Sequence, residues 1–109
     1  MKQEGLQVSI RAEGDELFAS LSGEIEHHST APVRTRIDTA LFKHRPRRLC
    51  LDLAGVRFMD SSGLGLVLGR AALCEEMGTE LCLLHPTSRV EKIFAIAGLS
   101  RLKNIKIEK

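Results

Sequence analysis

The stretch LCLDLAGVRFMDSSGLGLVLGRAALCEEMGTELCLL (residues 49–84) places two short apolar runs on either side of a long helical segment. Residues 49–53 and 81–84 have the length and the continuous hydrophobicity of buried strands. From 62 to 77 the apolar residues recur at helical spacing, and Gly78 follows as the stop. Two strands joined through a helix run parallel, so this stretch predicts a β-α-β unit at the centre of the fold.

Two alternating runs near the N-terminus predict a β-hairpin. Residues 7–14 and 17–23 alternate apolar with polar side chains, and a short turn at Gly14 and Asp15 separates them. Each run has its own apolar face, made of Val8, Ile10 and Ala12 in the first and of Leu17, Ala19 and Leu21 in the second. We expect the two runs to pair in an antiparallel arrangement.

A helix is predicted between this hairpin and the first buried strand. Ser29 supplies a hydroxyl cap, and Pro32 lies in the first turn, where proline is well tolerated. Apolar side chains then recur at the spacing of one helical face as far as about Phe42, and Pro46 ends the segment.

The C-terminal segment predicts a last helix and a last strand. Ser88 and Glu91 have the spacing of a capping box, Gly98 stops the helix, and Ile105 and Ile107 alternate in the strand. The predicted fold class is therefore α/β, with the order β-β-α-β-α-β-α-β and helices packed on a mixed β-sheet. We expect residues 1–109 to form a single domain.

Composition argues against several functional classes. The 16 Lys and Arg against 14 Asp and Glu give a net charge of only +2, and Trp and Tyr are absent, so nucleic acid is not an expected partner. No run approaches the ~20 apolar residues that span a bilayer, and no signal sequence is visible, so we expect a cytoplasmic protein without a membrane partner. Cys50, Cys74 and Cys82 lie in apolar runs, which predicts small buried side chains rather than metal or redox sites.

The residues most informative about function lie where a buried run meets the central helix. They are Asp60, Ser61, Ser62 and Gly63. The simplest interpretation is that Asp60 or Ser61 caps the helix. A serine at a helix N-terminus is also a favourable place for a phosphate, because unpaired N–H groups and the helix dipole stabilise negative charge there. Phosphorylation at such a position would change what can dock on the surface while leaving the fold intact.

Two glycines lie on the same side of this helix as Ser61. At about 100° per residue, one arc about 80° wide contains Ser61, Gly65, Gly69, Ala72 and Glu76. The apolar side chains Leu64, Val67, Leu68, Ala71 and Cys74 cluster on another arc. Each glycine inside a helix costs ~1 kcal/mol relative to alanine, so the pair requires a reason. Either the helix packs closely on the sheet, or the glycines form a flat surface for the backbone of a partner.

Three strings of residues resemble one known family. GEIEHH (23–28), FMDSSGLG (58–65) and LGR (68–70) are similar to the STAS-domain anti-sigma factor antagonists, in particular the bacterial sporulation type that controls sigma-F. The resemblance covers nearly the whole chain and implies a STAS-like fold. It implies that an anti-sigma factor with serine kinase activity, bound to ATP or ADP, phosphorylates Ser61. The unphosphorylated chain would bind that partner and free the sigma factor, and a serine phosphatase would reset the switch.

The same resemblance implies a set of site residues and a role without catalysis. Asp60 would lie beside the phosphorylated hydroxyl, Ser62 would help to cap the helix, and Glu26 stands where the family often has Asp. The partner-binding set is Glu26, Asp60, Ser61, Ser62, Gly63, Gly65 and Gly69. The protein would be a substrate of phosphoryl transfer rather than an enzyme, without catalytic residues, metal or cofactor.

Other motifs favour less specific interpretations. His27 and His28 suggest a metal site, but neighbours on an extended segment point apart and no third ligand is visible, so a solvated loop near the docking face is expected. The basic patch 43–48 is either solvated charge or a contact for an acidic protein surface. The spacing of Gly63, Gly65 and Gly69 departs from a dinucleotide-binding loop, which leaves a nucleotide-binding domain or small enzyme as one alternative. A structural STAS subunit of a signalling scaffold or of a membrane-transporter complex is the other.

Overall fold

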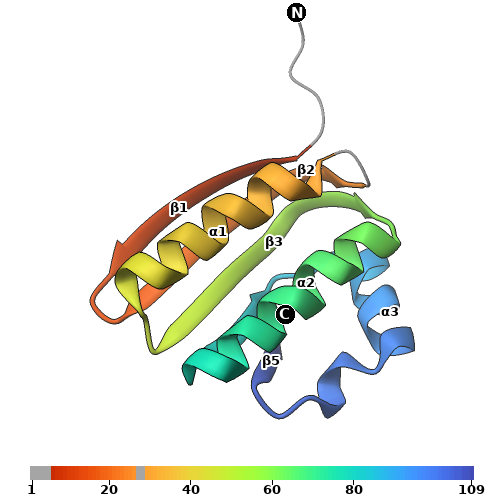
Figure 1. The fold of residues 1–109 in the computed structure, drawn as a ribbon. Helices are drawn as coiled ribbons and strands as arrows, with labels where there is room; N and C mark the ends of the chain where they lie inside the picture. The colour runs from red at the N-terminus through yellow and green to blue at the C-terminus, as the bar shows by residue number, and fades with distance from the viewer. Residues whose placement is uncertain (1–5, 27–28) are drawn as a thin grey trace, which may run out of the picture.

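The computed structural model describes residues 6–26 and 29–109. Its elements are β1 (Gln7–Glu13), β2 (Glu16–Ile25), α1 (Thr30–His44), β3 (Arg48–Met59), α2 (Ser61–Met77), β4 (Glu80–Leu84), α3 (Ser88–Ala97), the short 3-10 helix η1 (Leu99–Arg101) and β5 (Ile105–Glu108) (Figure 1). This order confirms the predicted alternation of strands and helices. Among these helices, none is both long and apolar enough to cross a membrane.

The strands form one mixed sheet in the order β1-β2-β3-β4-β5. β1 is antiparallel to β2, whereas β2, β3, β4 and β5 are parallel to their neighbours. Each helix therefore connects a strand to the next one along the sheet, always in the same direction. Because such connections are right-handed, α1, α2 and α3 are expected on the same face of the sheet.

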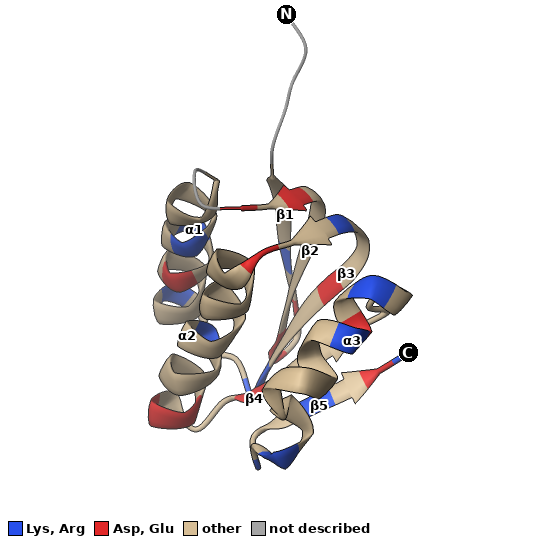
Figure 2. Cartoon of the chain, turned by 90° about the vertical axis from the view of Figure 1, so that its right-hand side faces the viewer, with Lys and Arg blue, Asp and Glu red and all other residues tan. Residues whose placement is uncertain are grey.

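The buried side chains show that the three helices do share one face. Alternate residues such as Leu17, Leu51 and Leu83 point into a single hydrophobic cluster with Ile37 of α1 and Phe94 of α3. The fully buried large side chains include Leu17, Leu21, Ile25, Ile37, Leu41, Leu49, Leu51, Leu53, Leu81, Leu83, Phe94 and Leu99. Because the sheet twists, α1 and α2 lie side by side while α3 lies apart from them, toward β5 (Figure 2).

The register of the hairpin places the apolar sets of both strands on one side of the sheet. Val8 pairs with Leu21, Ile10 with Ala19, and Ala12 with Leu17. Directly opposite residues of an antiparallel pair point to the same side of the sheet, so both apolar sets share the helix-covered face.

The strand β3 is much longer than the predicted run at 49–53. It extends to Met59 because it continues to pair with β2 beyond two register shifts, so that Glu24 faces Phe58 and Ile25 faces Met59. Several side chains of this second half are exposed, which is why its sequence lacks the hydrophobic pattern of a buried strand.

Ser29 stands at the predicted position before α1 but its hydroxyl does not cap the helix, and Ser88 is not the cap of α3. The Ser29 hydroxyl does not cap α1; it donates to the carbonyl oxygen of Glu26 over 2.9 Å and accepts from the Glu26 amide over 3.2 Å. The cap of α3 is Thr87, whose hydroxyl oxygen accepts from the Val90 amide, while Ser88 is the first residue of the helix. A capping hydroxyl needs a non-helical backbone one residue before the helix. Ser29 has a helical backbone at that position, and the Ser88 prediction is one residue too late.

The cysteines behave as predicted. Cys50, Cys74 and Cys82 are free thiols and all three are buried. Burial raises the pKa of Cys50 and of Cys74 to about 11, so both thiols stay protonated at neutral pH.

Candidate functional site

The end of β2 and the end of β3 meet at the same edge of the sheet. Because Ile25 faces Met59 in the parallel register, the residues that follow them, Glu26 and Asp60, reach this edge together. The Asp60 amide donates to the Ile25 carbonyl oxygen over 3.1 Å, which fixes the start of α2 against β2. The structure thus brings Glu26 together with the Asp60–Gly63 segment, although Glu26 and Asp60 are 34 residues apart in the sequence.

Asp60 is the cap of α2. Its Oδ1 accepts hydrogen bonds from the Ser62 amide over 2.8 Å and from the Gly63 amide over 3.2 Å. Ser62 therefore takes part in the cap through its backbone N–H. Ser61, the first residue of the helix, is exposed.

This cap changes the expectation for a phosphate at Ser61. Two of the first amides of α2 already donate to the Asp60 carboxylate, so they are not free to bind a second anion. A phosphate on Ser61 would also be repelled by the neighbouring carboxylate. We therefore expect such a phosphate to extend into solvent rather than fold back on the helix N-terminus.

Replacing Asp60 with Ala should lower the stability of the domain by about 1 kcal/mol, because two amides lose their acceptor. Asn is also a good cap, so Asp60→Asn should lose clearly less. Urea denaturation of the two variants and the wild type measures the difference. Equal stability of Asp60→Ala and wild type would show that the cap contributes nothing.

Gly63 lies in the packing layer. It is buried, and a Cβ built on it would collide with Met59 Cγ and approach Ile25 Cγ2 to 2.7 Å. Only a glycine lets α2 come this close to the ends of β2 and β3. Neighbouring side chains cover Gly63, so the structure gives it a packing role, and its contact with a partner stays a prediction.

Gly65 and Gly69 differ from Gly63. A Cβ at either position would meet no atom within 4 Å, so close packing of the helix on the sheet does not require them. Gly65 is exposed and Gly69 is half-buried. Of the two explanations for the pair, the structure excludes packing against the sheet and leaves an open surface.

The outward side of α2 is rotated from the predicted one. Leu68, expected in the buried arc, is 38% exposed. The residues of α2 that are buried are Gly63, Leu66, Val67, Arg70, Ala71 and Cys74. We call Ser61, Gly65, Leu68 and Ala72, which are all exposed, the outer face of α2. It combines one hydroxyl, one large apolar side chain and two small residues, which suits contact with another protein.

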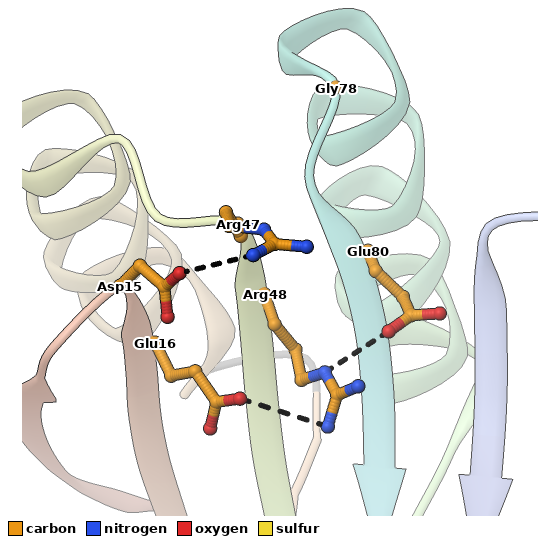
Figure 3. Close-up of a pocket in the computed structure, with 6 residues that line it drawn as sticks. All are labelled: Asp15, Glu16, Arg47, Arg48, Gly78 and Glu80. Atoms are coloured by element: carbon orange, nitrogen blue, oxygen red, sulfur yellow. Dashed lines mark hydrogen bonds and ion pairs between the residues drawn. The ribbon is translucent and has the colours of Figure 1, made fainter.

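The basic patch at 43–48 lies at the other end of the sheet, where β2, β3 and β4 begin. A hollow of about 410 Å³ opens there, and its charges are paired (Figure 3). Arg48 Nε lies 3.0 Å from Glu80 Oε1 and Arg47 Nη1 lies 3.5 Å from Asp15 Oδ2. These two arginines are therefore neutralised within the chain and lie far from Ser61 along the sheet.

The predicted loop histidines His27 and His28 lie outside the described residues. Within residues 6–26 and 29–109, no group of three or more His, Cys, Asp or Glu side chains is placed to hold a metal ion.

The fold and these features match one family of domains. The STAS domain matches residues 7–108 of the chain. The chain belongs to the STAS family. This STAS domain is 33% identical over 100 residues to the anti-sigma F factor antagonist of Paenibacillus polymyxa, across 92% of this chain and 86% of that protein.

Two solved structures extend the comparison. The unphosphorylated form of the anti-sigma factor antagonist SpoIIAA has a TM-score of 0.79 at 30% identity, covering 94% of this chain and 89% of that chain. The phosphorylated form of SpoIIAA, described as a Bacillus cell fate determinant, has a TM-score of 0.74 at 29% identity, covering 94% and 92%. The resemblance predicted from the motifs is confirmed.

Proposed function

We propose that this STAS domain is an anti-sigma factor antagonist whose binding is controlled by phosphorylation of Ser61. The unphosphorylated domain binds an anti-sigma factor and so frees the sigma factor. The observation that carries the proposal is the position of Ser61, which is exposed as the first residue of α2 on a face with no side chain at Gly65. The names of the similar proteins, an anti-sigma F factor antagonist and SpoIIAA in two phosphorylation states, support it.

The kinase in this proposal is the anti-sigma factor itself, acting on Ser61 with ATP, and a separate serine phosphatase removes the phosphate. The STAS domain is the substrate and needs no cofactor. A kinase must bring its nucleotide to the hydroxyl, and the exposure of Ser61 permits that approach.

Phosphorylation acts on binding through charge. It adds about −1.5 to −2 charges at neutral pH. Because Asp60 already holds the amides of Ser62 and Gly63, the phosphate remains on the outer face of α2. A partner that fits the neutral face would have to bury or displace this charge, which weakens docking. The core lies beneath α2 and is not disturbed.

Incubating the purified chain with its anti-sigma factor and ATP, followed by mass spectrometric mapping, tests the assignment. We expect one phosphate on Ser61 and none on the Ser61→Ala variant. The variant Ser62→Ala should still be phosphorylated, because Ser62 is half-buried and only its amide serves the cap. Phosphate found only on Ser62 or on a threonine would contradict the proposal.

A further inference from the structure

A hollow of about 290 Å³ lies between α1 and α2, next to the outer face of α2. The two helices run side by side in both views (Figures 1 and 2). We call this hollow the α1/α2 groove. Its lining residues are Thr30, Arg34, Ser62, Gly65, Leu66, Gly69 and Arg70.

The groove exists because two of the α2 residues that face α1 are glycines, which have no side chain to fill the space between the helices. Thr30 and Arg34 are one turn apart on α1, and Ser62, Leu66 and Arg70 recur every four residues on α2. Between them Gly65 and Gly69 leave open space, since a Cβ on either would meet nothing within 4 Å. The glycine pair therefore opens the floor of the groove to solvent.

The charges around the groove are unbalanced. Its described lining contains two arginines and no carboxylate. Arg70 is buried and its Nε lies 2.8 Å from Asp38 Oδ1, an ion pair without a well-aligned hydrogen bond. Burial lowers the pKa of Arg70, the Asp38 carboxylate opposes that shift, and the positive charge of Arg34 lowers the pKa further. Asp38 is therefore the partner of Arg70.

Arg34 is the second cation of the groove. Its side chain is exposed, and among the described residues no carboxylate lies within 4 Å of it. Thr30 and Ser62, in the first turns of α1 and α2, add hydroxyl groups at the mouth of the groove.

The start of α1 adds to the positive potential. α1 and α2 both begin at the carboxyl edge of the sheet, and neither has an acidic residue in its first turn. No described side chain caps α1, because the Ser29 hydroxyl is used by Glu26 and Glu24. The positive end of the α1 dipole therefore adds to the charge of Arg34, whereas the Asp60 carboxylate already balances the positive end of α2.

We propose that the α1/α2 groove binds a carboxylate side chain of the anti-sigma factor, and that Arg34 forms the ion pair. This inference rests on the proposed function, since the groove adjoins the outer face of α2. The groove suits a side chain rather than a nucleotide, because its volume is at the lower limit of small-molecule sites and its lining has no aromatic side chain. Arginine presents a planar pair of donors that matches a carboxylate.

Calorimetric titration of the full chain with the anti-sigma factor tests the groove. Arg34→Gln should raise the Kd about 10-fold and reduce its dependence on salt, because one charge-assisted contact is lost. Arg36→Gln is the matched control: Arg36 is an exposed arginine of the same helix, but it donates to the Val8 carbonyl on the β1 side. It should leave the Kd unchanged, and thermal melting confirms that both variants are folded.

A Kd for Arg34→Gln within about 2-fold of wild type would overturn the groove proposal. If Ser61→Asp still weakens binding strongly in that assay, the proposed function stands and only the proposal that the groove binds a carboxylate fails. If the wild type does not bind the anti-sigma factor, the proposed function fails first. Tight binding of ATP alone to the isolated chain, lost in Arg34→Gln, would also overturn the carboxylate assignment, because the groove would then hold a phosphate.

Discussion

The Ser61→Asp variant should bind the anti-sigma factor about 100-fold more weakly than wild type, a loss of about 2.7 kcal/mol. The new carboxylate lies beside Asp60, which already occupies the amides of Ser62 and Gly63, so its charge must stay on the outer face of α2. Docking would then bury an unpaired charge. Because Ser61 is exposed, the melting temperature should stay within about 3 °C of wild type. Calorimetric titration and circular dichroism measure the two quantities.

Two controls separate charge at Ser61 from general effects of substitution. Ser61→Ala should bind as well as wild type and should stay bound after incubation with ATP, since it cannot be phosphorylated. Ser88→Asp places the same charge at the same position of another helix, because Ser88 is the exposed first residue of α3. It should bind normally. Equal binding by Ser61→Asp and wild type would exclude the switch and favour a structural STAS subunit instead.

The Gly63→Ala variant should lose about 1–3 kcal/mol of stability, although alanine is the better helix former. Its Cβ would lie 2.7 Å from Ile25 Cγ2 and would collide with Met59 Cγ. Ile25 is fully buried and β-branched, so its side chain cannot rotate away. The helix would have to move from the ends of β2 and β3. Urea denaturation measures the loss, and a gain in stability would show that α2 shifts at no cost.

Gly65→Ala is the matched control on the same helix. Its Cβ meets no atom within 4 Å, so this variant should gain about 0.5–1 kcal/mol from helix propensity. Gly65→Gln should also fold, but its long side chain would cover the outer face of α2 and part of the groove, and binding of the anti-sigma factor should weaken. If Gly65→Gln unfolds the domain, Gly65 serves packing and the surface interpretation is wrong.

The buried side of α2 shows where prediction from the sequence failed. Almost every residue from 61 to 74 is apolar, glycine or serine, so the hydrophobic pattern has little contrast and its direction is poorly defined. The pattern therefore predicts that Leu68 lies on the buried side of α2, whereas its side chain is 38% exposed. Arg70 is buried because Asp38 of α1 lies 2.8 Å from it, and no local pattern shows a partner on another helix.

The sequence by itself determined the kinds of elements, their order and the position of Ser61 at the start of a helix. These depend on periodicity, caps and glycine stops, which are properties of residues close together in the chain. Only the tertiary structure decided that Gly63 is pressed against Ile25 and that Arg34 faces α2 across an open groove. Those relations depend on how closely segments more than 25 residues apart approach each other. Packing of the whole core sets that distance, and no local pattern encodes it.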